Sequence, residues 1–205
     1  MLRVGLTGGL ATGKSYVGAL LASWGCHLLK ADELGHRLLR KGEPCYIPTV
    51  ERFGPAILRA DGEIDRAALG AIVFSDPAAL EDLNSIVHPV VFQYEKDWMD
   101  SIEAAEPSAI AIVEAAILVE TGNYKSFDKL IVTWCPEHMQ VERAVARGAT
   151  ESEVRRRLQR QIPVDEKRAY ADHIIDTSGT LRETDEQTRR LFEKLVTLER
   201  EGPHP

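Results

Sequence analysis

The stretch GLTGGLATGKSY, from Gly5 to Tyr16, follows an apolar start and precedes a segment of helical character. Within it, Gly8–Ser15 fits the pattern G-x-x-x-x-G-K-[ST]. Glycines at this spacing let the backbone turn tightly, so that successive N–H groups point inward at phosphate oxygens. The following helix adds the positive end of its dipole. The stretch therefore predicts a phosphate-binding loop between a strand and a helix.

The ligand that fits this loop is a nucleoside triphosphate with Mg²⁺. Lys14 supplies a mobile positive charge to the β- and γ-phosphates, and Ser15 offers a hydroxyl as a ligand to the metal. The G-x-G-x-x-G spacing of a dinucleotide site does not occur here. The residues that we expect to bind the nucleotide in this stretch are Gly9, Leu10, Ala11, Thr12, Gly13, Lys14, Ser15 and Tyr16.

Apolar runs of strand length recur along the chain and alternate with helical patterns. This alternation predicts an α/β fold with a mostly parallel sheet covered by helices. We expect strands at 2–7, 26–31, 108–115, 129–134 and 173–177, and helices at 13–24, 33–40, 136–147, 151–161 and 181–201. Residues 202–205 are expected to fray.

Between these strands lies a long segment with few strand candidates, which indicates a helical insertion. Helical patterns cover 66–74, 78–87 and 90–105. We expect a break at His88-Pro89, because proline disfavours helical backbone at the residue before it.

Composition limits the classes of partner. The 205 residues carry a net charge of −7, which argues against nucleic acid as a ligand. The chain has no apolar run of membrane-spanning length, no signal-peptide pattern and no evident obligate protein partner. The three cysteines Cys26, Cys45 and Cys135 lack metal-ligand spacing and are interpreted as reduced thiols, so we expect a cytoplasmic protein.

Two acids follow strands at the sheet edge where ligands bind. Asp32 follows the second predicted strand, where it could accept a proton from a substrate hydroxyl, help to hold Mg²⁺ or cap a helix. Glu114 follows AIAIV and is a candidate carboxylate on the Mg²⁺ side, or a plain strand-end acid. Glu120 could face the same crevice.

Basic residues gather in an otherwise acidic chain between Gln140 and Arg168, where eight stand against five acids. We expect two helices here to form a movable arm that closes over the nucleotide and brings arginines to the transferred phosphoryl group. A solvated face of ion pairs is the alternative, and we assign Arg155 and Lys167 to it.

The ordered motifs resemble those of the dephospho-CoA kinase family over roughly Leu2–Leu195. The series comprises GLTGGLATGKS, KADELGHRLL, GEIDRAALGAIVFSD, LNSIVHPVV, EAAILVETG, FDKLIV, QVERAVAR, RRLQRQIP and ADHIIDTSGTL. The resemblance implies a P-loop NTPase fold with three layers, α/β/α. It implies a core of about 1–40, 108–136 and 172–205, a helical CoA-binding part of about 41–107 and a lid of about 137–171.

The same resemblance implies transfer of the γ-phosphoryl group of ATP, with Mg²⁺, to the ribose 3′-hydroxyl of dephospho-CoA. Asp32, Lys14 and Arg143 would then be catalytic. Further nucleotide-binding residues would be Arg143, Arg157, Ser178 and Gly179, and the acceptor would meet Thr7, Asp32, His88 and Glu114. From sequence alone, the alternative interpretation of His88 is a structural residue at a helix end, which is the more frequent role of such a histidine.

Five positions depart from the family pattern, and one of them is Val119, which replaces a phenylalanine. Ala11 stands where the family has glycine, which is tolerable only if its φ is negative. Tyr16 replaces a small hydroxyl residue, Ala116 replaces a proline, and Glu114 replaces the usual Asp. Two other functions stay open on sequence alone: a P-loop kinase for a nucleotide or a sugar-like alcohol, and a nucleotide-dependent switch. The Asn-Lys-x-Asp signature for guanine is absent, which weakens the switch.

Overall fold

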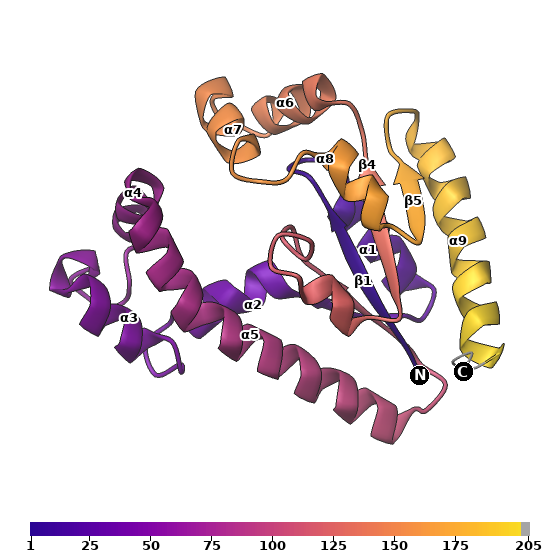
Figure 1. Cartoon of the computed structure of the whole chain (residues 1–205), viewed down its shortest axis with the longest axis horizontal. Coiled ribbons are helices and arrows are strands. Elements are labelled where there is room, and N and C mark those ends of the chain that lie inside the picture. The colour runs from indigo at the N-terminus through magenta and orange to yellow at the C-terminus, as the bar shows by residue number, and fades with distance from the viewer. Residues whose placement is uncertain (202–205) are drawn as a thin grey trace. The chain divides into compact units, whose positions relative to one another are not determined.

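A computed structural model describes residues 1–201 and contains one parallel sheet with helices around it (Figure 1). The strand order is β2-β3-β1-β4-β5, and each neighbouring pair is parallel. The strands are β1 (Leu2–Gly8), β2 (His27–Lys30), β3 (Ile110–Glu114), β4 (Lys129–Trp134) and β5 (His173–Asp176). The predicted α/β class with a parallel sheet is confirmed.

The helices lie mostly where the hydrophobic periodicity places them. They are α1 (Lys14–Ser23), α2 (Ala31–Leu38), α3 (Tyr46–Phe53), α4 (Arg66–Ser75), α5 (Pro77–Ala105), α6 (Glu137–Ala146), α7 (Glu151–Leu158), α8 (Val164–Lys167) and α9 (Leu181–Glu201). Short 3₁₀ turns are η1 (Pro55–Ile57), η2 (Asn123–Ser126) and η3 (Arg168–Tyr170). Helix α7 ends three residues earlier than predicted, so Gln161 lies outside it. The expected fraying of 202–205 falls outside the described residues.

The chain divides into two compact units. The first consists of Met1–Lys30 and the chain from Met99 onward, and it holds the whole sheet. The second is Ala31–Trp98 and is helical. Asp32 and His88 belong to the second unit, and the predicted lid segment belongs to the first. The predicted boundaries of core, insertion and lid stay a prediction.

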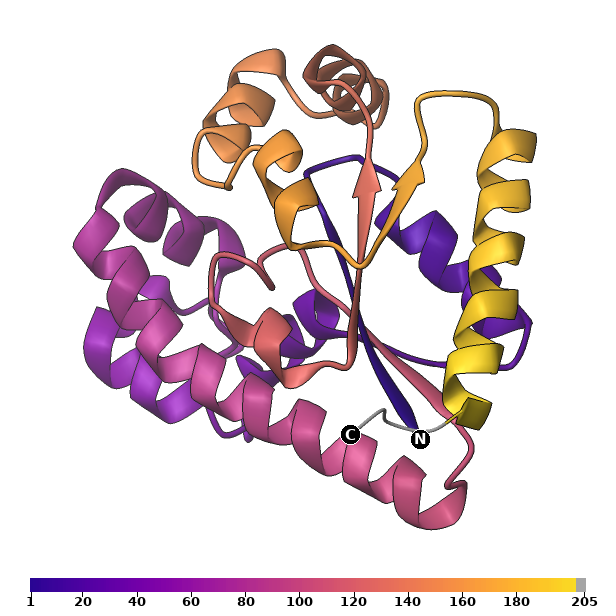
Figure 2. The same cartoon turned by 45° about the vertical axis from the view of Figure 1, so that its right-hand side comes forward.

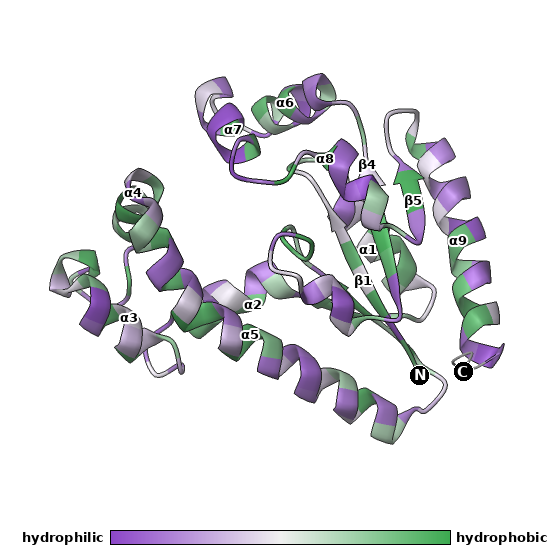
Figure 3. Cartoon of the chain, in the orientation of Figure 1, coloured by the Kyte–Doolittle hydropathy of each residue, from purple (hydrophilic) through white to green (hydrophobic). Residues whose placement is uncertain are grey.

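One apolar cluster fills the space between the sheet and the helices α1 and α9, which run alongside each other in Figure 2. Leu6 and Ile112 of the sheet, Leu21 of α1 and Leu195 of α9 are all buried in it. Strands β4 and β5 are largely green in the hydropathy view, whereas α7 is largely purple (Figure 3). This packing fixes β1 and α1, and thereby both ends of the loop between them.

The second unit has its own apolar cluster, built around Ile57, Leu69 and Val73. Its long helix α5 runs through Pro89 without a break, so the predicted interruption at His88-Pro89 is wrong. Packing supplies the reason. Val87 and Val91, one turn apart on either side of Pro89, both lie within 4.0 Å of the Cβ position of Gly35 on α2. These contacts hold both halves in one helix, while Pro89 faces outward.

Candidate functional site

The loop between β1 and α1 has the backbone geometry of a phosphate cradle. Gly13 has φ of 87°, in the left-handed region where glycine is at no disadvantage. A Cβ on Gly8 would lie 2.3 Å from Thr133 Oγ1 and 2.6 Å from the Thr133 carbonyl oxygen, so only glycine fits there. The close approach of the loop to β4 thus requires glycine at position 8, and the left-handed backbone favours glycine at position 13.

Ala11 also has a positive φ, of 56°. The expectation that its φ would be negative is therefore wrong. The left-handed α region is open to alanine, at a cost of about 1–2 kcal/mol relative to right-handed backbone. The backbone at Ala11 keeps a conformation typical of glycine in spite of the alanine methyl group, because contacts from the rest of the fold fix the loop before and after this residue.

Three threonine side chains tie the loop to the ends of β4 and β5. Thr12 Oγ1 donates to the carbonyl oxygen of Gly9 at 2.9 Å and lies 2.8 Å from Thr133 Oγ1. Thr177, which directly follows β5, donates through its hydroxyl to the carbonyl oxygen of Thr12 at 2.9 Å. All three threonines are buried. The loop is thus tied to the ends of β4 and β5.

The first turn of α1 carries the predicted lysine and serine. Lys14 Nζ donates to the carbonyl oxygen of Gly9 at 3.4 Å, so its ammonium group lies against the loop. Ser15 Oγ donates to Glu114 Oε1 at 2.6 Å. Glu114 ends β3 and is 5% exposed, and its Oε2 has no hydrogen-bond partner within residues 1–201. Tyr16 points elsewhere, since its hydroxyl donates to Asp185 of α9.

The hydroxyl of Ser15 and the buried carboxylate of Glu114 are oxygen ligands of the kind that Mg²⁺ prefers. Mg²⁺ commonly takes one or two carboxylates and completes its shell with substrate phosphates and water. The described part of the chain holds no group of three or more His, Cys, Asp or Glu side chains that could bind a metal by themselves. The donor set therefore fits Mg²⁺ that arrives with a nucleotide.

Arg143 of α6 reaches the same end of the sheet. Its Nη1 donates to Thr177 Oγ1 at 3.1 Å and its Nη2 to the Thr177 carbonyl oxygen at 2.6 Å. Through Thr177, the guanidinium group is linked to the backbone of Thr12 in the loop. Burial raises the pKa of the nearby Cys135 thiol, which favours its protonated form.

The turn after β5 contains Ser178 and Gly179, as predicted. The Ser178 N–H donates to Asp176 Oδ1 at 2.8 Å. Thr180 and Glu183 cap the start of α9, with the Thr180 N–H donating to Glu183 Oε2 at 2.7 Å. This turn therefore has a fixed shape beside Thr177. Arg157 lies exposed on α7.

Thr7 is buried at the end of β1, and its hydroxyl donates to the carbonyl oxygen of Ala116 at 3.3 Å. Asp32 lies exposed in the first turn of α2, within the second unit. His88 lies in α5, its ring centroid 5.7 Å from that of Phe92, and burial lowers its pKa. The roles of Thr7, Asp32 and His88 toward an acceptor stay predictions.

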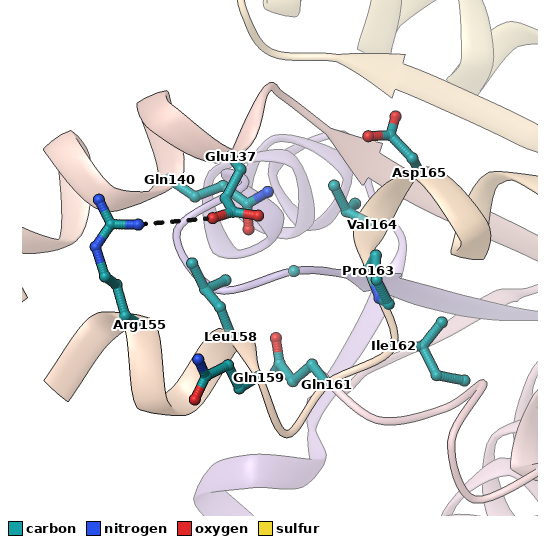
Figure 4. Close-up of a pocket in the computed structure, with 11 residues that line it drawn as sticks. Glu137, Gln140, Arg155, Leu158, Gln159, Gln161, Ile162, Pro163, Val164 and Asp165 are labelled. Atoms are coloured by element: carbon teal, nitrogen blue, oxygen red, sulfur yellow. Dashed lines mark ion pairs between the residues drawn. The ribbon is translucent and has the colours of Figure 1, made fainter. Parts of the chain in front are cut away.

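A cavity of about 340 Å³ lies beside the loop, between α6, α7 and the segment that follows α7 (Figure 4). Its lining includes Gly9 and Gln140, with Leu158 and Gln161 from the arm. Gln140 Nε2 donates to the Cys135 carbonyl oxygen, which leaves Gln140 Oε1 without a hydrogen-bond partner among the described residues. The arginine arm thus borders the phosphate loop directly, with Leu10 N–H donating to Gln161 Oε1 at 3.1 Å.

Two of the arm's charges have different surroundings. Arg155 pairs with Glu151 at 2.7 Å on the exposed side of α7, as predicted. Lys167 is completely buried and pairs with Glu120 at 2.7 Å, so its assignment to a solvated face is wrong. The single turn of α8 is too short for a hydrophobic period, and the position of Lys167 within the fold decides its burial.

Sequence reasoning missed Thr177 and Thr133 as parts of the site. Thr177 had a usable signal, since it is the polar last residue of the predicted strand 173–177, at the carboxyl end of a parallel strand where ligands bind. Thr133 gave none, because an internal threonine is ordinary in a strand.

Comparison with known proteins decides the family. The family model described as dephospho-CoA kinase matches residues 2–183. The chain belongs to the dephospho-CoA kinase family. A dephospho-CoA kinase of Aquifex aeolicus is 40% identical over 196 residues, covering 96% of this chain and 98% of the relative.

Two solved structures have the same fold as this member of the dephospho-CoA kinase family. A Thermus thermophilus protein has a TM-score of 0.81 at 31% identity, covering 94% of this chain and 96% of its own. A dephospho-CoA kinase from Campylobacter jejuni has a TM-score of 0.71 at 24% identity, covering 95% and 96%. The three-layer P-loop kinase fold expected from the resemblance is confirmed, and the nucleotide-dependent switch loses its support.

Proposed function

We propose that this chain transfers the γ-phosphoryl group of ATP to the ribose 3′-hydroxyl of dephospho-CoA, giving coenzyme A and ADP. The observation that carries the chemistry is the phosphate loop with the Ser15 hydroxyl on the buried carboxylate of Glu114. Membership of the family supports the choice of acceptor.

In this proposal, the loop N–H groups and Lys14 bind and orient the β- and γ-phosphates. Ser15 and Glu114 would hold Mg²⁺ together with the phosphates. When bound, the ion neutralises charge that develops on the transferred group. Arg143, linked to Thr177, would add positive charge on the side of β5. Arg157, Ser178 and Gly179 complete the predicted nucleotide contacts.

On the acceptor side, Asp32 would accept the proton of the attacking hydroxyl or orient that hydroxyl, since phosphoryl transfer has a loose transition state. Thr7 and His88 are the remaining proposed acceptor contacts. Closing of the arm would exclude water from the phosphoryl group.

A cytoplasmic location is part of the proposal. The three cysteines are free and buried, which suits a reducing compartment. Among residues 1–201, none of the helices is both long and apolar enough to cross a bilayer.

The test is ADP release from MgATP with dephospho-CoA, and with AMP and shikimate as alternative acceptors. We expect ADP release, and a product phosphorylated at the ribose 3′ position, only with dephospho-CoA. Turnover with AMP or shikimate, or turnover that needs no acceptor, would leave the phosphate loop in place and overturn the assignment of the acceptor.

A further inference from the structure

An ion pair with a fully buried lysine lies next to the phosphate loop and has no part in the function described above. Lys167 Nζ lies 2.7 Å from Glu120 Oε1. The lysine side chain is 0% exposed and the glutamate side chain 17% exposed. Lysine is among the residues that are almost never fully buried, so this placement calls for a specific reason.

The pair holds backbone groups of two separate segments. Lys167 Nζ donates to the carbonyl oxygen of Ala116, in the turn after β3, at 2.7 Å. Glu120 Oε1 accepts the N–H of Ile162, in the segment between α7 and α8, at 3.1 Å. The pair therefore clamps the turn after β3 to the base of the arm.

Each held segment contacts the phosphate loop or the strand that leads into it. The Ala116 carbonyl oxygen accepts hydrogen bonds both from Lys167 Nζ and from the hydroxyl of Thr7, at the end of β1. The residue before Ile162 is Gln161, whose Oε1 accepts the Leu10 N–H of the loop at 3.1 Å. Figure 4 shows Gln161 and Ile162 as neighbours at the edge of the cavity.

Stability alone is a poor explanation of such a pair. Removing two charges from water costs free energy that their attraction often fails to recover, and apolar replacements are often as stable or more stable. Directed hydrogen bonds to chosen backbone groups are what an apolar pair cannot supply. The Lys167–Glu120 pair supplies them on both sides of the loop.

We propose that Lys167 and Glu120 are positioning residues for phosphoryl transfer, which act through Ala116 and Thr7 on one side and through Ile162 and Gln161 on the other. They hold the end of β1 and the loop backbone at Leu10 in the arrangement that the transferred phosphate requires. The expected effect on phosphoryl transfer rests on the proposed function, whereas the positioning of the loop backbone by the pair does not.

The decisive variant is the double replacement Glu120→Leu with Lys167→Met, which keeps the site filled and leaves no charge unpaired. We expect its thermal midpoint to match or exceed that of the parent. We expect its kcat to fall by about 100-fold with the KM for ATP unchanged, because small misplacements of reacting groups have effects of that size. Glu120→Gln, which keeps an acceptor for Ile162, should retain more of the activity than the double variant.

Amide hydrogen exchange gives a readout that needs no acceptor. In the nucleotide-free protein, the peptide containing Leu10 should exchange faster in the double variant, while peptides of β4 and α9 keep the parent rate. A matched control removes the exposed pair Arg182–Glu186 of α9, 3.0 Å apart, by Arg182→Met with Glu186→Gln. That control should change neither kcat nor the exchange rate of the peptide containing Leu10.

The outcomes separate cleanly. A stable double variant with parental loop exchange and parental kcat would overturn the positioning role, because the pair would then be only structural. If the parent itself fails to phosphorylate dephospho-CoA, the proposed function fails, and loop exchange alone decides the inference. If the double variant does not fold, a slower kcat and faster loop exchange in Glu120→Gln support the proposal, and parental values contradict it.

Discussion

The phosphate loop is held by contacts from distant parts of the chain, whereas the second unit, Ala31–Trp98, is held by its own helices and apolar cluster. Thr133 of β4 and Thr177, which follows β5, fix the loop although both lie more than a hundred residues away in sequence. In the second unit, residues such as Ile57 and Leu69 pack against near neighbours in the chain. The loop therefore depends on segments far from it in sequence, and the second unit depends on its own helices.

Because the two regions are held differently, substitutions in them should have different effects on nucleotide binding and on turnover. Changes at the loop should alter nucleotide binding and turnover together. Changes at exposed residues of the second unit should alter turnover while nucleotide binding persists. Substitutions in each of the two regions test that division.

Asp32→Asn should give the largest effect. Asparagine keeps the size and the first-turn position on α2 but cannot accept the proton of the acceptor hydroxyl. We expect kcat to fall by about 1,000-fold, while the Kd for MgATP, measured by calorimetry, stays at the parental value. Parental kcat would remove Asp32 from catalysis, and a parallel loss of ATP binding would break the division between the two regions.

Lys14→Ala should weaken both binding and turnover, because in the proposed function the ammonium group contacts the phosphates in the ground state and in the transition state. We expect kcat/KM for ATP to fall on the order of 100-fold or more, with a raised Kd for MgATP. Steady-state kinetics and calorimetry check this together. Lys30→Ala, outside the loop at the end of β2, is the control; equal losses in both variants would contradict a specific role for Lys14.

Thr177→Val tests the contacts that hold the loop from β5. Valine keeps the shape and loses the hydroxyl that joins Thr12 to Arg143. Loss of a buried hydrogen-bonded hydroxyl costs about 1–3 kcal/mol, so we expect a loss in kcat/KM for ATP of about tenfold or more. Thr188→Val is the matched variant, since it removes a buried hydroxyl that donates to the Thr184 carbonyl oxygen within α9, and it should keep parental kinetics. If Thr177→Val kept parental kinetics, the loop would not depend on β5.

Ala11→Gly should improve stability slightly. Glycine relieves the cost of φ at 56°, although it also adds freedom to the unfolded chain. We expect a net gain of about 1 kcal/mol or less in the free energy of unfolding, and a rise of about 2–4 °C at most in the thermal midpoint. Ala22→Gly, within helix α1, should have the opposite sign. A lower midpoint in Ala11→Gly would mean that the methyl group makes contacts that outweigh the strain.

The same contrast explains what sequence reasoning could reach. The loop Gly8–Ser15 is predictable because phosphate binding requires its glycines, its lysine and its serine at this spacing. The strands are predictable from runs of apolar residues. The positive φ of Ala11, the unbroken helix through Pro89 and the burial of Lys167 were all mispredicted. In each case, contacts from another segment of the fold outweigh the local preference of the residue. Those contacts come from Thr133 and Thr177, from Gly35, and from Glu120 and Ala116 respectively.

His88→Gln should give the smallest effect, on the pH dependence of stability. Burial lowers the pKa of His88 below its ordinary value of 6.5, so at pH above 6.5 the imidazole is neutral in both the folded and the unfolded chain and contributes no difference. As the pH falls below 6.5, the unfolded chain binds the proton first, and the free energy of unfolding decreases until the folded pKa is reached. Glutamine does not titrate and removes this contribution.

Urea unfolding at pH 7.5 and at pH 5.5 measures the effect. We expect the loss of stability between the two values to be smaller in His88→Gln than in the parent, by less than about 1.4 kcal/mol per pH unit, the limit for one proton. Some loss should remain, since burial also lowers the pKa of His36 and His173. An equal loss in variant and parent would show that His88 takes up its proton as easily in the folded helix as in water. Its burial in α5 would then be incomplete, and a direct contact with the acceptor would become the better explanation of its place in the second unit.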